Sequence, residues 1–333
     1  MGDAPRSPLA KWELAALAAA GGAGGLAVVN RLIEMGAGEA YSVLDGDRGH
    51  YAWTHGDIYY TVRGSGAPIV LVHGIYTGAS AFEYRRIFDQ LAQRYRVFAP
   101  DLLGFGLSDR PPVVYSPMLY EELIADFVRQ VVGGADHPAR IIASSLSAAF
   151  TIRAAAERPG LFERLVLIEP TGIEELAQAN ETLPRRLSRA LLRSPVLGQG
   201  LYNLIASRLS IRTYLRLQVY ADPNLASDDV VDYYYTSAHQ RGARFAPASF
   251  ISGTLNTPVT ATYPLLQLPI LLCWGKDARV NPLQHASGFR QSNDRAELRV
   301  FDCGGLPQDE AAEEFVREVS AWMAIPIPSP RRR

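Results

Sequence analysis

One short segment places a serine where its hydroxyl can be exposed at a sharp bend. The residues Ala143-Ser144-Ser145-Leu146-Ser147 join the predicted strand "RIIASS" to the helical pattern "LSAAFTIRAAAERP". Small residues on both sides of the middle serine allow a strained strand-to-helix turn that presents its oxygen at the N-terminus of the helix. Glycines are usual at the two flanks, and Ala143 and Ser147 stand there in this chain. Ser145 is therefore the candidate nucleophile.

Two other turns with polar residues follow apolar runs earlier in the chain. The run "PIVLV" ends in His73-Gly74, and a tight turn there allows the backbone N–H of Ile75 to point into a pocket. The run "YRVFAP" leads into a glycine-rich loop headed by Asp101, and an aspartate at such a place more often organises the loop than catalyses. With Ser145 third in this series, the spacing predicts a site formed at the ends of successive strands.

A rigid scaffold must position these turns, and the chain predicts one from about residue 50 onward. "HYAWT" and "DIYYTVRG" alternate in polarity around His55-Gly56 and predict a β-hairpin. Apolar runs then alternate with helical segments as far as a final helix at about 309–322; the earlier helical segments lie at 80–93, about 115–132, 146–159 and from about 282. This alternation predicts an α/β fold with a mainly parallel sheet covered by helices on both faces.

Residues from about 172 to 262 break the alternation and show a helical pattern without a buried strand. An all-helical insertion between two strands would sit over the C-terminal edge of the sheet, where open α/β sheets bind ligands. We therefore predict a cap over the site, with the cap tyrosines in the cap's own core. The cap's composition and the usual nature of such pockets favour a small apolar ligand.

Taken together, residues of about 50–325 resemble the α/β-hydrolase superfamily, with the nearer likeness to the cap-bearing branch of epoxide hydrolases, haloalkane dehalogenases and meta-cleavage-product hydrolases. The resemblance implies an α/β-hydrolase fold with an eight-stranded sheet and a helical cap. It also implies Ser145 as nucleophile and the N–H groups of Ile75 and Leu146 as an oxyanion hole. Dehalogenases and epoxide hydrolases carry an aspartate in place of the serine. The serine therefore favours a carbonyl centre: an ester, lactone, thioester, amide or cleavable diketone.

The resemblance further implies an acid after the seventh strand and a histidine after the eighth, and both places are altered. In "LLCWGKDARVNPL" the place of the acid is taken by Ala278, one residue after Asp277. In "FDCGGLPQDE" the place of the histidine is taken by Gly305. A triad hydrolase that loses one member typically loses ~10⁴ to 10⁶ in turnover. The chain is therefore expected to have a degenerate catalytic triad.

Two carboxylates are candidates to replace the acid, Asp277 and Glu169, and the sequence does not choose between them. The base has no evident replacement, and among the histidines only His239, in the cap, is placed where it could reach the pocket. The others are predicted in the hairpin, a connecting loop, the first polar turn or an outer helix: His50, His55, His73, His137 and His285.

Four interpretations stay open on these residues. The chain is an enzyme with altered machinery, acting on a small apolar ester or lactone through Ser145, or catalysing a lyase- or cyclase-like step. Alternatively, it is a pseudoenzyme that binds an apolar small molecule without turnover. It is also open that an ordinary esterase has had its triad replaced by design, or that the chain is a scaffold protein whose only visible signal is its N-terminal segment.

Bulk composition limits the partners. The 333 residues carry 33 basic and 34 acidic side chains, a net charge of −1, so no basic surface indicates nucleic acid. The two cysteines, Cys273 and Cys303, lie in apolar contexts and predict buried free thiols rather than a disulfide. No spacing of metal ligands appears, and we expect neither a metal nor a cofactor.

The N-terminal residues 1–45 are predicted as an apolar helical segment. Within it residues 14–30 are uncharged but rich in Ala and Gly, at the lower limit of length for a membrane-spanning helix. A membrane-associated helix, a helix lying on the protein itself and a cleaved signal peptide stay open. The protein is therefore expected to be cytoplasmic or membrane-associated.

The remaining segments are predicted as a hydrolase core at 46–171 and 263–325, a cap at 172–262 and a basic tail at 326–333.

Overall fold

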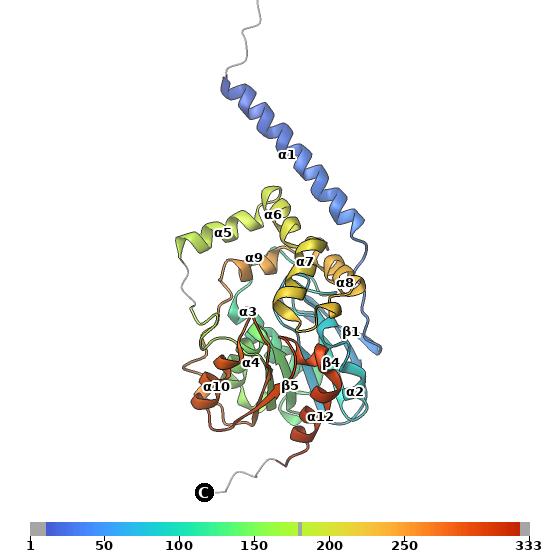
Figure 1. Ribbon diagram of the computed structural model, residues 1–333, viewed down its shortest axis with the longest axis vertical. Helices are drawn as coiled ribbons and strands as arrows, with labels where there is room; N and C mark the ends of the chain where they lie inside the picture. The colour runs from blue at the N-terminus through green and yellow to red at the C-terminus, as the bar shows by residue number, and fades with distance from the viewer. Residues whose placement is uncertain (1–10, 179–181, 327–333) are drawn as a thin grey trace, which may run out of the picture.

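The computed structural model describes residues 11–178 and 182–326, and its centre is one open sheet of eight strands (Figure 1). The strands lie in the order β1-β2-β4-β3-β5-β6-β7-β8. Strand β2 is antiparallel to both of its neighbours, and every other pair of neighbours is parallel. This sheet confirms the predicted mainly parallel α/β fold. Its strands are β1 (Asp47–Trp53), β2 (Gly56–Arg63), β3 (Pro68–Val72), β4 (Arg96–Pro100), β5 (Ala139–Ser144), β6 (Phe162–Ile168), β7 (Ile270–Gly275) and β8 (Ala296–Phe301).

Helices cover both faces of this sheet, and alternate residues of the central strands enter two separate cores. In β3, Val70 and Val72 belong to the core under α3, α4 and α10, whereas Ile69 and Leu71 belong to the core under α2 and α12. Burial on both faces explains why these strands are continuous apolar runs. The helices of the two layers and the last loop are α2 (Phe88–Ala92), α3 (Pro117–Phe127), α4 (Ser145–Glu157), α10 (Ala286–Ser292), α11 (Pro307–Glu310) and α12 (Ala312–Met323).

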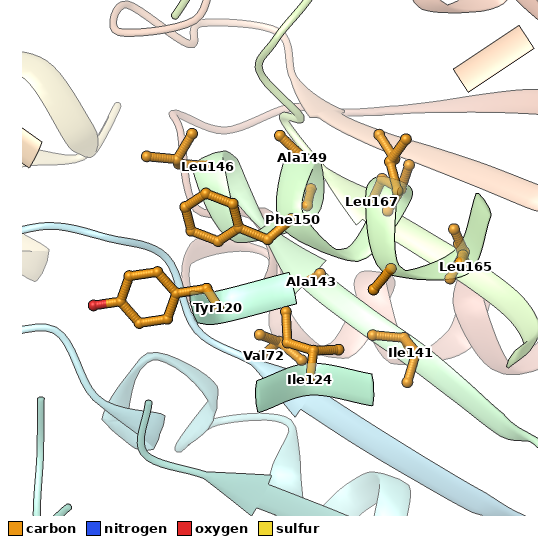
Figure 2. Close-up of a cluster of buried hydrophobic side chains, with 14 of the residues drawn as sticks. Val72, Tyr120, Ile124, Ile141, Ala143, Leu146, Ala149, Phe150, Leu165 and Leu167 are labelled. Carbon is orange, nitrogen blue, oxygen red and sulfur yellow. The ribbon is translucent and has the colours of Figure 1, made fainter. Parts of the chain in front are cut away.

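The first core anchors α4, the helix that begins at the candidate serine. Figure 2 shows Phe150 of α4 beside Tyr120 of α3, above Val72 and Ala143 of the strands. The two rings stack with centroids 5.1 Å apart, and both side chains are fully buried. Truncating a buried phenylalanine to alanine typically costs roughly 3–5 kcal/mol. Packing of this strength fixes α4, and with it the position of its first residue.

Two of the predicted helices are interrupted in the structure. The segment predicted as a helix at 80–93 divides into a 3₁₀ turn, η1 (Ala81–Tyr84), and α2. All four residues of η1 are buried, an arrangement that a surface helix with a single apolar face cannot provide. The segment predicted at about 115–132 forms α3 and then a π-helical turn, η2 (Val128–Val132).

Between β6 and β7 lies the segment predicted as the cap, and no strand occurs in its described residues, 172–178 and 182–262. Phe82 of η1 stacks on Tyr233 of this segment with ring centroids 3.8 Å apart, so the cap is joined to the core by aromatic packing. Its helices are α5 (Leu183–Arg193), α6 (Leu197–Ile205), α7 (Arg208–Tyr214), α8 (Asp228–Ala238) and α9 (Phe245–Ile251), with a π-helical turn, η5 (Leu215–Val219), after α7.

The N-terminal helix α1 (Lys11–Gly36) leans on the cap and projects beyond the body of the molecule (Figure 1). It is fixed to α6 by Asn30, whose Nδ2 donates to the carbonyl of Val196 at 3.0 Å and whose Oδ1 accepts from Asn203 at 3.0 Å. Within the described chain, no helix combines the length and the apolar character needed to cross a membrane. Residues 327–333 of the predicted basic tail lie outside the described residues.

Candidate active site

Ser145 is the first residue of α4 and follows β5 directly. Its φ angle of 52° lies in the left-handed region, which typically costs a non-glycine residue roughly 1–3 kcal/mol. Such a conformation is what a strained strand-to-helix turn requires. Within the described chain the Ser145 hydroxyl makes no hydrogen bond to another residue. The serine is therefore presented at the bend, but no side chain orients its oxygen.

Three non-glycine residues of the described chain have positive φ angles, and all three line the same pocket: Ser145 (52°), Glu169 (45°) and Leu176 (54°). Backbone strain persists only where the surrounding structure enforces it, and it gathers at ligand-binding and catalytic sites. The shared location of these residues marks this pocket as the candidate site.

The pocket has a volume of about 400 Å³ and lies between the sheet's carboxyl edge and the cap. The core contributes Ile75, Ser145, Glu169 and Gly305, so four of the predicted site positions lie together here. The cap contributes mainly apolar and aromatic side chains, including Ile211, Tyr214, Leu215, Tyr234 and Phe250. Tyr234 is buried in the cap's own core, as predicted, and lines the pocket as well, whereas Tyr214 is 44% exposed and lies outside that core.

The turn after β3 is held by a histidine that has no free ring nitrogen. His73 is fully buried; its Nδ1–H donates to the carbonyl of Gly74 at 2.7 Å, and its Nε2 accepts from the N–H of Leu102 at 3.0 Å. Burial lowers the pKa of His73, which keeps the ring neutral. His73 is therefore structural, and it fixes the turn that carries Ile75 to the pocket.

A buried glutamate that the sequence did not single out also supports this turn. The Oε2 atom of Glu83 accepts from the N–H of Gly74 at 2.9 Å and from the hydroxyl of Tyr76 at 3.0 Å. Its Oε1 atom accepts from Nε2 of Gln308, in the short helix α11 that follows Gly305, at 2.7 Å. Burial raises the pKa of Glu83. A single glutamate in a helical segment gives no signal of this network, which only the packing of η1 creates.

The loop headed by Asp101 behaves as predicted. Its carboxylate accepts from the N–H groups of Ala81 and Leu107, each at 2.7 Å, and so ties the loop after β4 to η1. Asp101 does not line the pocket. It is therefore a loop-organising residue.

Glu169 follows β6 and points its carboxyl group into the base of the pocket. The side chain is 5% exposed; its Oε1 accepts from the N–H of Gly275 at 3.1 Å. Asn281 donates from Nδ2 to the Glu169 carbonyl at 3.0 Å, which holds the strained backbone in place. Burial raises the pKa of Glu169 to about 8, only partly offset by the hydrogen bond from Gly275.

Gly305 lies directly against the second oxygen of this carboxyl group. A Cβ atom built on Gly305 would lie 3.4 Å from Glu169 Oε2 and 3.6 Å from the carbonyl of Val219. Asp277, the other acid candidate, is exposed and is not among the residues that line the pocket, and Ala278 is buried in the core. The carboxylate that faces the place of the expected histidine is therefore Glu169.

None of the six histidines, all of which lie in the described chain, lines the pocket. His239, the residue predicted to have the best chance, donates from Nδ1 to the carbonyl of Tyr235 at 2.8 Å and faces a separate hollow between α1 and the cap. His285 bonds Asn281 Oδ1, an atom of a pocket residue, at 2.9 Å through Nδ1 and Glu174 at 3.1 Å through Nε2. Ser145 thus has no imidazole partner.

Both cysteines are free and buried, as predicted. Among the described residues, no three His, Cys, Asp or Glu side chains are grouped so that they could hold a metal ion.

Comparison with known proteins agrees with this architecture. The profile of the alpha/beta hydrolase family matches residues 69–318, three quarters of the chain, and the protein belongs to this family. Curated relatives include an uncharacterized protein of Mycobacterium tuberculosis, 28% identical over 81% of this chain and 79% of that protein. A second is 2-hydroxy-6-oxo-2,4-heptadienoate hydrolase of Pseudomonas putida, 26% identical over 78% and 90%.

A third relative is cis-3-alkyl-4-alkyloxetan-2-one decarboxylase of Shewanella oneidensis, 23% identical over 82% of this chain and 87% of that protein. Solved structures with the same fold include a serine hydrolase involved in carbazole degradation, with a TM-score of 0.69, 21% identity and coverage of 84% and 99%. The epoxide hydrolase CorEH has a TM-score of 0.69, 20% identity and coverage of 84% and 98%. At this identity the structural likeness establishes the fold.

Proposed function

We propose that the protein acts on a small apolar ester or lactone, with Ser145 as nucleophile and Glu169 in place of the missing imidazole as the group that exchanges a proton. The observation that carries this proposal is the meeting of Ser145, Glu169, Ile75 and Gly305 in one apolar pocket of about 400 Å³. The backbone N–H groups of Ile75 and Leu146 would bind the carbonyl oxygen as its negative charge develops.

The chemistry follows the usual course of acyl transfer. The Ser145 oxygen forms a bond to the carbonyl carbon, and the serine proton passes to the Glu169 carboxylate, directly or through one water. The C–O bond of the ester or lactone then breaks, and Glu169 returns this proton to the leaving oxygen. Water then releases the acyl group from the serine. Without an imidazole we expect the reaction to be slow, because the acid form of Glu169 predominates at neutral pH and serine is a poor nucleophile until its proton is removed.

The raised pKa of Glu169 gives this proposal a pH dependence. A pKa of about 8 means that the acid form predominates at neutral pH and that the base form appears as pH rises through 8. If Glu169 is the base, turnover must increase between pH 7 and pH 9. A rate that falls over the same range would indicate that the acid form is the working one.

The test uses p-nitrophenyl butyrate and a dialkyl β-lactone as substrates, together with labelling of Ser145 by a fluorophosphonate. We expect slow labelling and turnover that rise with pH, disappear in Ser145→Ala, and lose their pH dependence in Glu169→Gln. Asp277→Asn, which removes an exposed carboxylate outside the pocket, is the matched control and should behave like the wild type. Equal loss in Asp277→Asn and Glu169→Gln would contradict the assignment of Glu169.

Two alternatives have specific support. The lack of an imidazole in the pocket favours a pseudoenzyme that binds an apolar compound without turnover. This alternative predicts a rise in melting temperature with the lactone and no labelling of Ser145.

The acid form of Glu169 favours a lyase- or cyclase-like step. The Shewanella relative is named for decarboxylating an oxetan-2-one, a four-membered lactone with alkyl chains. Product analysis by mass spectrometry distinguishes hydrolysis from loss of CO₂.

Three further expectations stay predictions: a core at 46–171 and 263–325 with a cap at 172–262, a cytoplasmic or membrane-associated location, and membrane association through residues 14–30.

A further inference from the structure

The outer side of the cap exposes an unusual amount of apolar surface. In α5, Leu183, Leu187 and Leu191 recur every fourth residue and therefore lie in one stripe along the helix. In α6, Leu197, Leu201 and Leu204 form a second stripe. These six residues, which we call the leucine face, are 40–70% exposed. A helix normally buries such a stripe, and contiguous exposed apolar patches mark interaction surfaces.

The charge of the same segment is one-sided. Residues 183–217 contain seven arginines and neither an aspartate nor a glutamate. Several of these arginines have partners, among them Arg208 and Arg212, which pair with Asp232 and Asp228 of α8. Next to the face, the hollow between α1 and the cap, of about 500 Å³, is lined by Arg31, Arg241 and Arg244 against the single carboxylate of Glu34. By count, the segment that carries the leucine face therefore has an excess of basic over acidic side chains.

The N-terminal helix extends the same surface. α1 is fixed to α6 through Asn30, and its residues Val28, Val29, Leu32 and Met35 are 50–67% exposed. Apolar side chains with arginines around them, on helices that lie on the surface, are the pattern of helices bound in a lipid interface.

The leucine face adjoins the opening of the site. Ile205, at the end of α6, lines the pocket and is 39% exposed; Tyr214 and Ile251 likewise line the pocket and are about two-fifths exposed. The apolar lining of the pocket therefore continues onto the outer side of the cap through these three residues. An apolar molecule leaving a lipid layer would reach Ser145 by this route without crossing water.

A second copy of this chain is a poorer occupant of the face than a lipid surface. A dimer with two-fold symmetry would place the same patch on both partners and so bring one set of arginines against the other. Like charges facing each other across an interface cost several kcal/mol. An anionic lipid surface offers the opposite charge, and each arginine close to it contributes about 1 kcal/mol.

We propose that the leucine face of α5 and α6, together with α1, docks on an anionic lipid surface so that the mouth of the pocket opens toward the lipid. The site is peripheral and separate from the chemistry proposed for Ser145. Its test measures binding and not turnover, so failure of one proposal leaves the other standing.

The experiment is flotation of the full chain with phosphatidylcholine vesicles, with and without phosphatidylglycerol. We expect about tenfold or more tighter binding to the anionic vesicles, weakened by added salt. The variant Leu187→Gln/Leu197→Gln/Leu204→Gln should lose most of this binding. The matched control is Leu265→Gln/Val300→Gln/Ile325→Gln. It replaces three apolar residues that lie outside the cap and are 45–69% exposed, and it should bind like the wild type.

Circular dichroism and gel filtration of both triple variants establish that they fold. The proposal is overturned if the wild type does not float with anionic vesicles. It is overturned equally if the folded leucine-face variant still binds vesicles like the wild type. It is also overturned if the variant binds vesicles like the wild type but elutes as a monomer where the wild type elutes as a dimer, since a second copy of the chain would then occupy the face.

Discussion

Restoring one side chain, Gly305→His, is the sharpest test of how the site is built. A Cβ atom fits at this position: it would lie 3.4 Å from Glu169 Oε2 and 3.6 Å from the Val219 carbonyl, both ordinary contacts. Gly305 is not among the glycines with positive φ, so a histidine is not strained there. The hydrogen bond from the Gly305 N–H to the Val219 carbonyl, 2.7 Å long, is kept because histidine also has an N–H.

The expected magnitude follows from what a triad base contributes. Removing the base from a triad hydrolase costs about 10⁴- to 10⁶-fold in turnover, so its return should give roughly a 10³-fold gain or more even with imperfect alignment. Glu169 already faces the new ring, so the second substitution Ala278→Asp is not needed. An imidazolium beside Glu169 should also lower the pKa of that carboxyl from about 8, because an opposite charge stabilises the carboxylate.

The assay is p-nitrophenyl butyrate hydrolysis with the rate of fluorophosphonate labelling at Ser145. Gly305→His should gain activity, Gly305→Asn should not, and Gly305→His/Glu169→Gln should lose most of the gain because the ring is no longer oriented by a carboxylate. A folded Gly305→His variant with less than about a tenfold gain would refute the reasoning, since a repaired triad must do better than that. A gain that survives Glu169→Gln unchanged would refute it equally, because Glu169 would then have no part in orienting the ring.

Three further predictions concern stability. Glu169→Gln should flatten the pH dependence of the free energy of unfolding. Because folding raises the pKa of Glu169 from 4.5 to about 8, the stability it contributes is full below pH 4.5 and is lost as pH rises through 8, by ~5 kcal/mol at most. Thermal melts at pH 5, 7 and 9 check this, with the substitution of an exposed glutamate, Glu313→Gln, as control. Ser145→Gly should stabilise the fold by ~1 kcal/mol, because glycine adopts a φ of 52° without strain; urea titration measures this, and a loss of stability would contradict the strained turn. Phe150→Ala should cost roughly 3–5 kcal/mol in the same assay, and a loss below about 1 kcal/mol would show that the core under α4 is looser than its packing indicates.

The fold was predictable because its signals are local. Buried parallel strands such as "PIVLV" must be apolar on both faces, and the small residues around Ser145 are a steric requirement of the turn itself. The buried thiol of Cys273 was predictable for the same reason, since it lies inside a buried strand, whereas Cys303 lies two residues after β8. The helical character of 172–262 was equally clear from its period.

The site was only half predictable, because its other half depends on contacts between distant segments. Asp277 and Glu169 were equal candidates in the sequence. The structure distinguishes them because β6 and β7 lie side by side, so that the loop after β8 brings Gly305 over Glu169, while Asp277 turns outward into solvent. The network of Glu83 with Gly74, Tyr76 and Gln308 joins residues more than two hundred positions apart and leaves no trace in the pattern.

By itself, the sequence determined the family, the small residues at the Ser145 bend and the glycine at position 305, where the family resemblance implies a histidine, since each depends on which residue occupies a position. Only the tertiary structure decided which carboxylate faces the place of the expected histidine, that its pKa is raised to about 8, and that the cap exposes a leucine face at the mouth of the pocket. The physical reason is that burial and proximity belong to the folded chain, and both the charge of an acid and the exposure of a leucine depend on them.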